Sequence, residues 1–417
     1  MRSTSDYAPG KTERQAEEPA NTEAQRTSGV ACWICGAPTE VFFHIEGVPV
    51  CCNILWPNRE DAIRARRGDI RLTFCRECGH IYNSAFDPER LTYTANYDNS
   101  LHFSPRFQEY ARDLAARLVE TYDLHKKKVV EIGCGNAEFL ALLCALGPNR
   151  GVGFDPSFIP GRVNTTVGDG IEIIADSYSE LYANRSCDLL CSRHMLEHVP
   201  DPLAIIKSVS HALRETPCAA VYFEVPNALF TLREKGIWDV IYEHCSYFTP
   251  QSIYHLFANA GFGVLNVKES FGRQFLSLEA LASNEHPSRY SPPPGDMDRL
   301  ADDVAAFAGY RQNLVDRWTA VFDEMRKKGQ RAIPWGAGAK GAIFLNVLGE
   351  QALVDYVVDI NPHKQGHFVP GTGQQIVAPE ALRQLKPDAL ILMNPIYQDE
   401  VKRIVAGLGL APEFLAL

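Results

Sequence analysis

A short strand of β-branched residues that runs into a glycine turn, with an acidic residue about twenty positions after the turn, most constrains the fold of this chain. The strand spans residues 128–132, turns at Gly133 and Gly135, continues as a helical pattern over 137–146 and leads to a second strand that ends at Asp155. Such units pack as parallel sheets with helices on both faces. The pattern therefore predicts an α/β protein, and its recurrence near the C-terminus predicts a second Rossmann-like unit.

Length and charge limit the classes of function. The 417 residues predict two or three domains. The net charge of −10 argues against a nucleic-acid partner, because phosphate binding needs a clustered positive surface. No apolar run approaches the ~20 residues that span a membrane. Residues 1–28 are polar and are expected to form a disordered tail, not a signal peptide. We therefore expect a cytoplasmic protein that acts on a small-molecule substrate, with no nucleic-acid or membrane partner.

Cysteine spacing predicts a metal site. Twelve cysteines in a chain without an export signal indicate a reducing compartment, where thiols serve as metal ligands or core residues. Four of them form two CxxC-Gly pairs: Cys32, Cys35, Cys75 and Cys78. Two such pairs predict one tetrahedral structural zinc site, with reduced structural cysteines or a redox CxxC as the alternative. Cys51 and Cys52 lie between the pairs and are expected in the core.

The first glycine turn has the chemistry of a nucleotide site. Gly133 and Gly135 let the backbone approach a ligand, and Asp155 stands where ribose hydroxyls are usually held. No third glycine follows at the dinucleotide spacing, so an adenosine-containing cofactor without a bound pyrophosphate is implied. The Glu-x-Gly-Cys-Gly form resembles the first motif of class I methyltransferases. This resemblance implies S-adenosylmethionine as the cofactor, with Glu131 near the methionine ammonium, Asp155 on the ribose and Asp169 at the adenine.

Two histidine-containing segments are candidates for the chemistry. Residues 194–198 match the HxxEH pattern of some zinc proteases, but the prolines that follow prevent the continuous helix that such a site needs. The same run resembles the fourth-strand loop of class I methyltransferases, where His198 either contacts substrate or is structural. Glu243 and His244 lie among aromatic residues in segment 238–250, which suits a histidine with a pKa near neutrality that acts as a general base.

The second glycine loop allows two interpretations. Residues 336–341 match GxGxxG, and Asp359 ends the next strand, so a nicotinamide site is one interpretation. The other is a substrate site, because the glycines Gly336 and Gly338 at a helix N-terminus, together with Lys340, favour the negative charge of a nucleotide diphosphate.

From about residue 30 to its end, the chain resembles the bacterial sugar C-methyltransferases. Segment 238–250 matches their Tyr-His-Glu-His-x-x-Tyr-Phe-Ser run in part, and the C-terminal runs Gly-Ala-x-Ala-Lys-Gly, Asn-Pro-His-Lys-Gln-Gly and Val-Pro-Gly-Thr match closely. The resemblance implies a nucleotide-linked keto-sugar as substrate, bound by the second glycine loop. It also implies His244 as the base with Glu243 beside it, and we keep His198 and Tyr97 as further candidates.

The match is incomplete around the base. Ile241 and Tyr242 replace a tyrosine and a histidine of the family segment, which leaves the accepting atom, carbon or oxygen, open. An O-methyltransferase on a similar acceptor, a nicotinamide-dependent oxidoreductase and a non-catalytic zinc scaffold are therefore the alternatives.

The predicted organisation is a small zinc-binding domain at 29–85, a methyltransferase domain at 86–285 and a second α/β domain at 299–417. A proline-rich linker at 288–295 separates the last two. We interpret Lys364, in the last domain, as a surface lysine.

Overall fold

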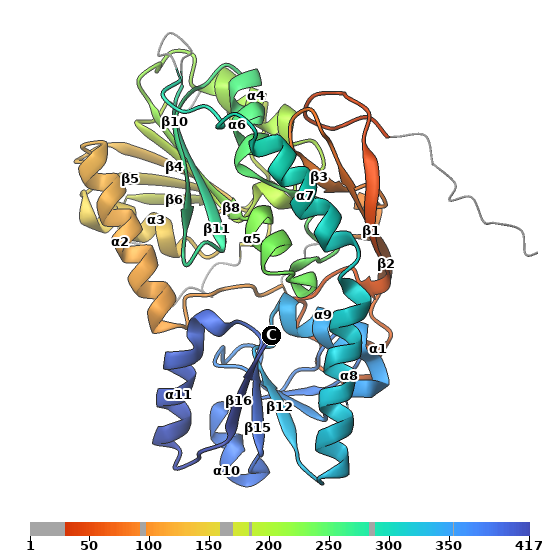
Figure 1. Cartoon of the computed structure of the whole chain (residues 1–417). Helices are drawn as coiled ribbons and strands as arrows, with labels where there is room; N and C mark the ends of the chain where they lie inside the picture. The colour runs from red at the N-terminus through yellow and green to blue at the C-terminus, as the bar shows by residue number, and fades with distance from the viewer. Residues whose placement is uncertain (1–29, 92–96, 159–169, 183–185, 283–287, 353) are drawn as a thin grey trace, which may run out of the picture.

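The computed structural model describes residues 30–91, 97–158, 170–182, 186–282, 288–352 and 354–417. The predicted tail and the adenine candidate Asp169 lie outside this part of the chain. The described residues form three sheets with their helices, two sheets in the upper part of Figure 1 and one in the lower part. The predicted α/β fold is thereby confirmed. None of the described helices combines the length and the apolar character that a membrane-spanning segment needs.

The largest sheet has seven strands in the order β10-β11-β8-β7-β4-β5-β6. Their bounds are β4 (Lys128–Ile132), β5 (Arg150–Phe154), β6 (Ile171–Ile174), β7 (Leu189–Arg193), β8 (Ala220–Pro226), β10 (Gly263–Ser270) and β11 (Phe275–Leu281). Strands β4 to β8 are parallel, and β10 and β11 form an antiparallel hairpin beside β8. Alternate residues of the strands pack on α2 (Pro105–Thr121) and α3 (Glu138–Leu146) on one face and on α4 (Pro202–Ala212) and α6 (Pro250–Asn259) on the other.

The N-terminal sheet is antiparallel and has the order β1-β2-β3-β9. Its strands are β1 (Glu40–Pro49), β2 (Arg67–Phe74), β3 (Ile81–Asn83) and β9 (Ser246–Tyr247), and the short helix α1 (Arg59–Ile63) precedes β2. Strand β9 belongs to the middle of the chain, and it follows the base candidate His244 directly. The N-terminal sheet is therefore completed by a segment of the predicted catalytic region.

The C-terminal sheet has five parallel strands in the order β14-β13-β12-β15-β16. The strands are β12 (Ala332–Trp335), β13 (Tyr356–Val358), β14 (Gln375–Val377), β15 (Ala389–Leu392) and β16 (Glu413–Ala416). Its helices are α8 (Arg311–Lys327), α9 (Ala339–Leu348), α10 (Leu382–Leu385) and α11 (Gln398–Gly407). Before them comes α7 (Asp296–Ala308), so two helices precede the first strand of this sheet.

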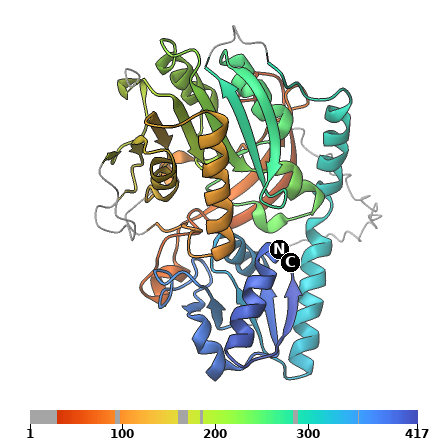
Figure 2. The same ribbon diagram turned by 90° about the vertical axis from the view of Figure 1, so that its left-hand side faces the viewer.

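One hydrophobic core joins the upper and lower parts. Helices α7 and α8 follow one another from the upper part to the lower part in both views (Figure 1 and Figure 2). Phe307 at the end of α7 packs on Phe43 of β1, with ring centroids 4.9 Å apart, and Phe344 of α9 packs on Trp318 of α8. Helix α5 (Ala228–Arg233) contributes Leu232 to the same cluster. Burial of this shared apolar surface fixes the C-terminal sheet relative to the rest of the molecule.

Candidate active site

A cavity of about 800 Å³ lies between the seven-stranded sheet and the C-terminal sheet. Both glycine loops line it, one from each sheet. Of the described residues predicted as active-site residues, all but Glu243 line this cavity: Tyr97, Glu131, Gly133, Gly135, Asp155, His198, His244, Gly336, Gly338, Lys340 and Asp359. Residues predicted from motifs up to about 260 positions apart are thus brought to one space.

The turn after β4 contains two glycines and is hydrogen-bonded to Asp155, the residue that follows β5. Gly133 has φ +72°, and a Cβ there would lie 2.6 Å from the Cβ of Met195, so glycine is required. A Cβ at Gly135 would meet nothing within 4 Å, which leaves space for a ligand. Asp155 accepts hydrogen bonds from the backbone N–H groups of Gly135 (2.8 Å) and Ser157 (2.8 Å). Its carboxylate therefore faces the turn where a ribose would be held.

Glu131 is a buried carboxyl group without a full set of partners. Its residue is 2% exposed, and among the described residues its Oε2 has no hydrogen-bond partner. Burial raises its pKa to about 8, and the guanidinium of Arg193 opposes that rise. An ammonium group beside Oε2 would remove this cost of burial. The residues of this turn therefore fit the ribose and the amino-acid part of S-adenosylmethionine.

The turn after β12 repeats the same hydrogen bonding. Asp359 accepts from the backbone N–H groups of Ala337 (2.7 Å) and Asn361 (2.8 Å), as Asp155 does in the first turn. A Cβ at Gly338 would meet nothing within 4 Å, so this loop also has open space beside it. The Nζ of Lys340 lies 2.9 Å from a carboxylate oxygen of Asp239, which compensates its charge.

The candidate base, His244, lies in segment 238–250, which comes between the two glycine loops in the sequence. The ring of His244 is partly buried, and its centroid lies 4.9 Å from that of His198. Burial, followed by the neighbouring His198 and His194, lowers the pKa of His244 well below 6.5. His198 Nδ1 lies 3.0 Å from the backbone oxygen of Glu243, and burial lowers its pKa to about 4. The expected pKa near neutrality is therefore wrong for His244, because burial disfavours the charged ring. Both rings are neutral near pH 7, and a neutral imidazole can accept a proton.

Glu243 is not among the residues that line the cavity. It is fully buried, and its Oε2 accepts from the backbone N–H of Cys52 (3.0 Å). Burial raises its pKa to about 7, and hydrogen bonds from Cys52 and from the side chain of Tyr97 oppose that rise. The carboxyl group thus ties segment 238–250 to the backbone of Cys52 and to Tyr97.

Sequence reasoning missed the cavity lysine. Lys364 was interpreted as a surface residue, and this interpretation is wrong: it is 6% exposed and lines the cavity. Its loop docks on the segment before α2, where Asp98 accepts from Asn361 Nδ2 (3.0 Å) and lies 2.8 Å from His363 Nδ1. The Asn-Pro-His-Lys run was the available signal, but nothing local in it shows which segment it meets.

The four paired cysteines meet at one point. Their Sγ atoms lie within 4.8 Å of one another, with Cys32 and Cys78 3.6 Å apart and Cys35 and Cys75 3.5 Å apart. A tetrahedral zinc ion with bonds near 2.3 Å requires sulfur atoms about 3.8 Å apart. The donor set and its geometry therefore fit one zinc ion. Cys51 and Cys52 are buried in the core, as predicted.

Two residues that follow the second cysteine pair, Gly79 and His80, contact segment 238–250. His80, two residues beyond Cys78, lies with its Nδ1 3.8 Å from Cys32 Sγ and its Nε2 3.2 Å from Ser246 Oγ. The hydroxyl of Thr249, the N-cap of α6, donates to the backbone oxygen of Gly79 (3.0 Å). The cysteine cluster therefore helps to hold the strand that follows His244.

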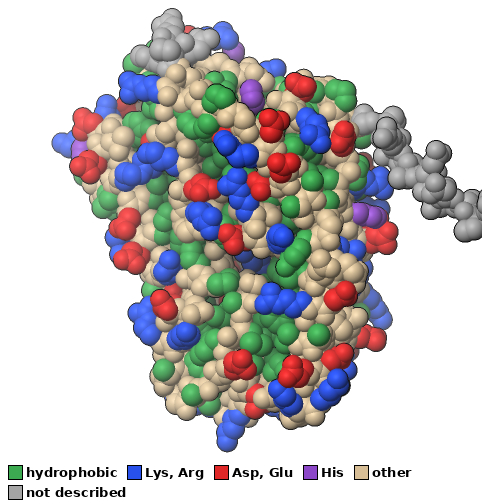
Figure 3. Space-filling model, in the orientation of Figure 1, with side chains coloured by type: hydrophobic (Ala, Val, Ile, Leu, Met, Phe, Trp, Pro, Cys, Tyr) green, Lys and Arg blue, Asp and Glu red, His purple; other side chains and the backbone are tan. Residues whose placement is uncertain are grey.

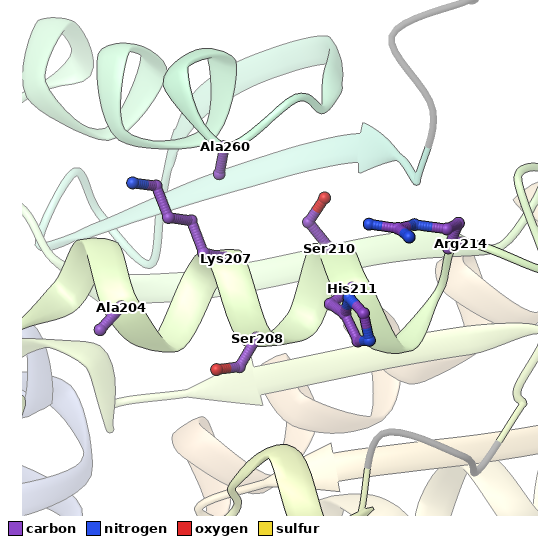
Figure 4. Close-up of a pocket in the computed structure, with 7 residues that line it drawn as sticks. All are labelled: Ala204, Lys207, Ser208, Ser210, His211, Arg214 and Ala260. Atoms are coloured by element: carbon purple, nitrogen blue, oxygen red, sulfur yellow. The ribbon is translucent and has the colours of Figure 1, made fainter.

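A second hollow, of about 450 Å³, lies along α4 and shares no residue with the cavity (Figure 4). Lys207, His211 and Arg214 give it a basic character, and Ala260 at the end of α6 completes it. On the face of the molecule drawn in Figure 3, acidic and basic side chains are interspersed.

Comparison with known proteins assigns both halves of the chain. Residues 103–267 match the family described as methyltransferase domain, and residues 298–408 match the C-methyltransferase C-terminal domain. The C-methyltransferase NovU of Streptomyces niveus is 28% identical over 294 residues, which are 66% of this chain and 67% of that protein. The ubiquinone biosynthesis O-methyltransferase of Escherichia coli is 28% identical over 109 residues, 25% of this chain and 45% of that protein. A methyltransferase structure from Aquifex aeolicus matches 43% of this chain and 95% of its own, at 16% identity and a TM-score of 0.35.

Proposed function

We propose that this chain, which belongs to the C-methyltransferase family, methylates a carbon atom next to the ketone of a nucleotide-linked sugar. It is an S-adenosylmethionine-dependent C-methyltransferase. This identification replaces the oxidoreductase and the zinc scaffold that the sequence alone left open. One observation carries the finer proposal: two glycine loops from different sheets face one cavity, and a neutral histidine lies in its wall.

The two loops would hold different molecules. The turn with Glu131 and Asp155 would take the cofactor, because it offers a carboxylate for the ribose and a carboxyl group for the ammonium. The loop with Asp359 and Lys340 would take the nucleotide of the acceptor, because the backbone N–H groups at the start of α9 favour negative charge. In this arrangement the reacting atoms meet between the two sheets.

The chain would supply a base and a closed space for the reaction. Bound S-adenosylmethionine supplies an electrophilic methyl group. The neutral imidazole of His244 would take the proton from the carbon beside the ketone, and the C–H electron pair would form the enolate. The enolate carbon would then bond to the methyl group as the S–CH3 electron pair returns to sulfur. Tyr97 and Glu243 would hold the segment that carries the base.

The proposed zinc ion is structural. Four protein ligands would fill its coordination sphere, so no position would remain for substrate. The proposed location of the protein, the cytoplasm, rests on its thiol-rich sequence.

Product analysis tests the function. The protein would be incubated with methyl-13C S-adenosylmethionine and a panel of nucleoside diphosphate keto-sugars, with release of S-adenosylhomocysteine as the first readout. Carbon–proton correlation spectra of the product are expected to show the labelled methyl on a carbon adjacent to the ketone. A label on oxygen would replace the C-methylation proposal by O-methylation, and turnover only with acceptors that lack a nucleotide would remove the role of the second loop.

Asp155→Ala is expected to weaken S-adenosylhomocysteine binding by about 10-fold to 100-fold, the equivalent of one lost charge-assisted hydrogen bond of roughly 1.5 to 3 kcal/mol. Asp155→Asn is the conservative variant, because it keeps one oxygen, which can accept from the N–H of either Gly135 or Ser157, and loses the charge and the second acceptor. Calorimetric titration gives both affinities. Wild-type affinity in the alanine variant would mean that the ribose is bound elsewhere.

The affinity for S-adenosylhomocysteine is expected to rise as pH increases from 6 to 8. The pKa of Glu131 in the free protein is about 8, so below that pH the carboxyl group must lose its proton before it can pair with the ligand ammonium. The increase is at most about tenfold per pH unit and ends near the pKa. Glu131→Gln should bind more weakly at pH 8 and show little of this slope. A flat wild-type profile would separate Glu131 from the ammonium.

A further inference from the structure

One cationic side chain in the described wall of the cavity has no carboxylate in direct contact with it. Three lysine or arginine residues are among its described lining residues: Arg193, Lys340 and Lys364. Arg193 is 2.9 Å from a carboxylate oxygen of Glu224, and Lys340 is 2.9 Å from one of Asp239. Lys364 has no such ion pair within the part of the chain that the structure describes. The charge of Lys364 is therefore not compensated by a carboxylate in direct contact, and it is available to an anionic oxygen in the cavity.

Neutral oxygens hold Lys364 in place. Its Nζ donates to Asn53 Oδ1 (3.1 Å) and to the backbone oxygen of Ala337 (3.3 Å). An ammonium has three N–H groups, so one remains for a ligand on the cavity side. The side chain costs little entropy to position, because it is already buried and held at two points.

Lys364 also lies near the base rather than only near the nucleotide loop. Asn53 follows Cys52, whose backbone N–H donates to Glu243, the residue before His244. Burial raises the pKa of Glu243 to about 7, and the charge of Lys364 is among the effects that oppose that rise. The ammonium thus lies within electrostatic reach of the catalytic segment.

We infer that Lys364 is a catalytic residue that donates a hydrogen bond to the ketone oxygen of the acceptor and stabilises the enolate. This inference rests on the proposed function. As His244 takes the proton from carbon, the C–H electron pair becomes the C=C bond and the carbonyl pair moves to oxygen, beside the ammonium. When the methyl group bonds to carbon, the C=O bond forms again and the charge on oxygen disappears. Lys364 keeps its proton throughout.

Hydrogen exchange isolates this step from methyl transfer. With S-adenosylhomocysteine in place of the methyl donor, the enzyme would be incubated in D2O with a nucleoside diphosphate 4-keto-6-deoxyhexose, and deuterium at the carbon next to the ketone would be measured by NMR. In Lys364→Met the exchange rate at saturating acceptor is expected to fall by about 100-fold to 1,000-fold, as for loss of one oxyanion donor. Lys364→Arg, which keeps a charged donor, should retain more of the rate.

Binding measurements decide which anionic oxygen Lys364 contacts, that of the enolate or that of a phosphate group. The affinities of Lys364→Met for S-adenosylhomocysteine and for the nucleoside diphosphate alone are expected to stay within about threefold of wild type, as for an interaction made only in the transition state. Lys340→Met is the matched control. It should weaken binding of the nucleoside diphosphate, whereas hydrogen exchange at saturating acceptor should persist.

Two results would overturn the inference: wild-type exchange in Lys364→Met, or a loss of nucleoside diphosphate affinity with exchange retained, which would assign Lys364 to phosphate. Lys364→Gln, measured alongside with its affinity for S-adenosylhomocysteine, detects any general loss of folding. Failure of the proposed function has a different signature, because the wild type itself would then show no enzyme-dependent exchange, and the comparison with Lys364→Met applies only where the wild type exchanges and His244→Ala does not.

Discussion

His244→Ala is expected to lower turnover by roughly 100-fold to 10,000-fold and to leave the affinity for S-adenosylhomocysteine within about twofold of wild type. The reason is that the cofactor turn holds the donor without this histidine, whereas the acceptor carbon is a poor nucleophile until its proton leaves. Steady-state release of S-adenosylhomocysteine gives the rate, and calorimetry gives the affinity. Equal turnover in the variant would remove His244 from the mechanism and direct attention to His198 and Tyr97.

The neighbours of His244 give graded controls. Glu243→Gln keeps a side chain that can bond to Cys52 and Tyr97, so a smaller loss is expected than for His244→Ala. The pH profile is a second check. Because the pKa of His244 is well below 6.5, its imidazole stays neutral as the pH falls to 6.5. The loss of rate through protonation of His244 should therefore appear only below pH 6.5.

Cys75→Ser is expected to release the proposed zinc ion and to destabilise the N-terminal sheet strongly. Ligation of structural zinc contributes apparent free energies of about 10–16 kcal/mol in small zinc domains, and that energy supports folding. Metal analysis of the freshly purified wild type should find one zinc per chain, and thermal unfolding of the variant should begin at lower temperature. Because His80 and Gly79 contact the strand after His244, turnover should fall more than cofactor affinity.

Cys218→Ser is the control for the loss of a thiol, since Cys218 is exposed and far from the cysteine cluster in sequence. It should keep the metal and the wild-type melting temperature. Wild-type protein without zinc, or a Cys75→Ser variant that keeps it, would contradict the proposed site.

Local patterns were sufficient to predict the parallel units of the fold. Strands β4, β5, β7, β8, β12 and β13 coincide with stretches that are mainly apolar, because parallel strands buried on both faces are rich in apolar residues. The glycine turn after β4 was predicted from its glycine spacing, and the structure leaves no room for a side chain at Gly133. The four cysteines were predicted from spacing alone, and their sulfur atoms do converge.

Contacts between distant segments were beyond such patterns. The pairing of Lys340 with Asp239 and the burial of Lys364 beside Asn53 depend on how the C-terminal sheet docks, and no periodicity encodes that docking. Strand β9 is only two residues long and contains no β-branched residue, so its place in the N-terminal sheet was equally hidden. For the same reason the hydrogen bond between Glu243 and the backbone of Cys52 could not be predicted from the sequence.

The late arrival of β9 has a consequence for biosynthesis. Ser246 pairs with residues made some 166 positions earlier, so at ribosomal rates of about 5–20 residues per second the edge of β3 waits roughly ten to thirty seconds for its partner. An unpaired strand edge invites association with neighbouring chains. All four cysteines of the cluster emerge before this wait begins, so capture of the metal on the nascent chain would hold β2 and β3 together until the rest of the protein is made. Zinc supply during translation, more than in the finished protein, is then expected to decide the yield of folded enzyme.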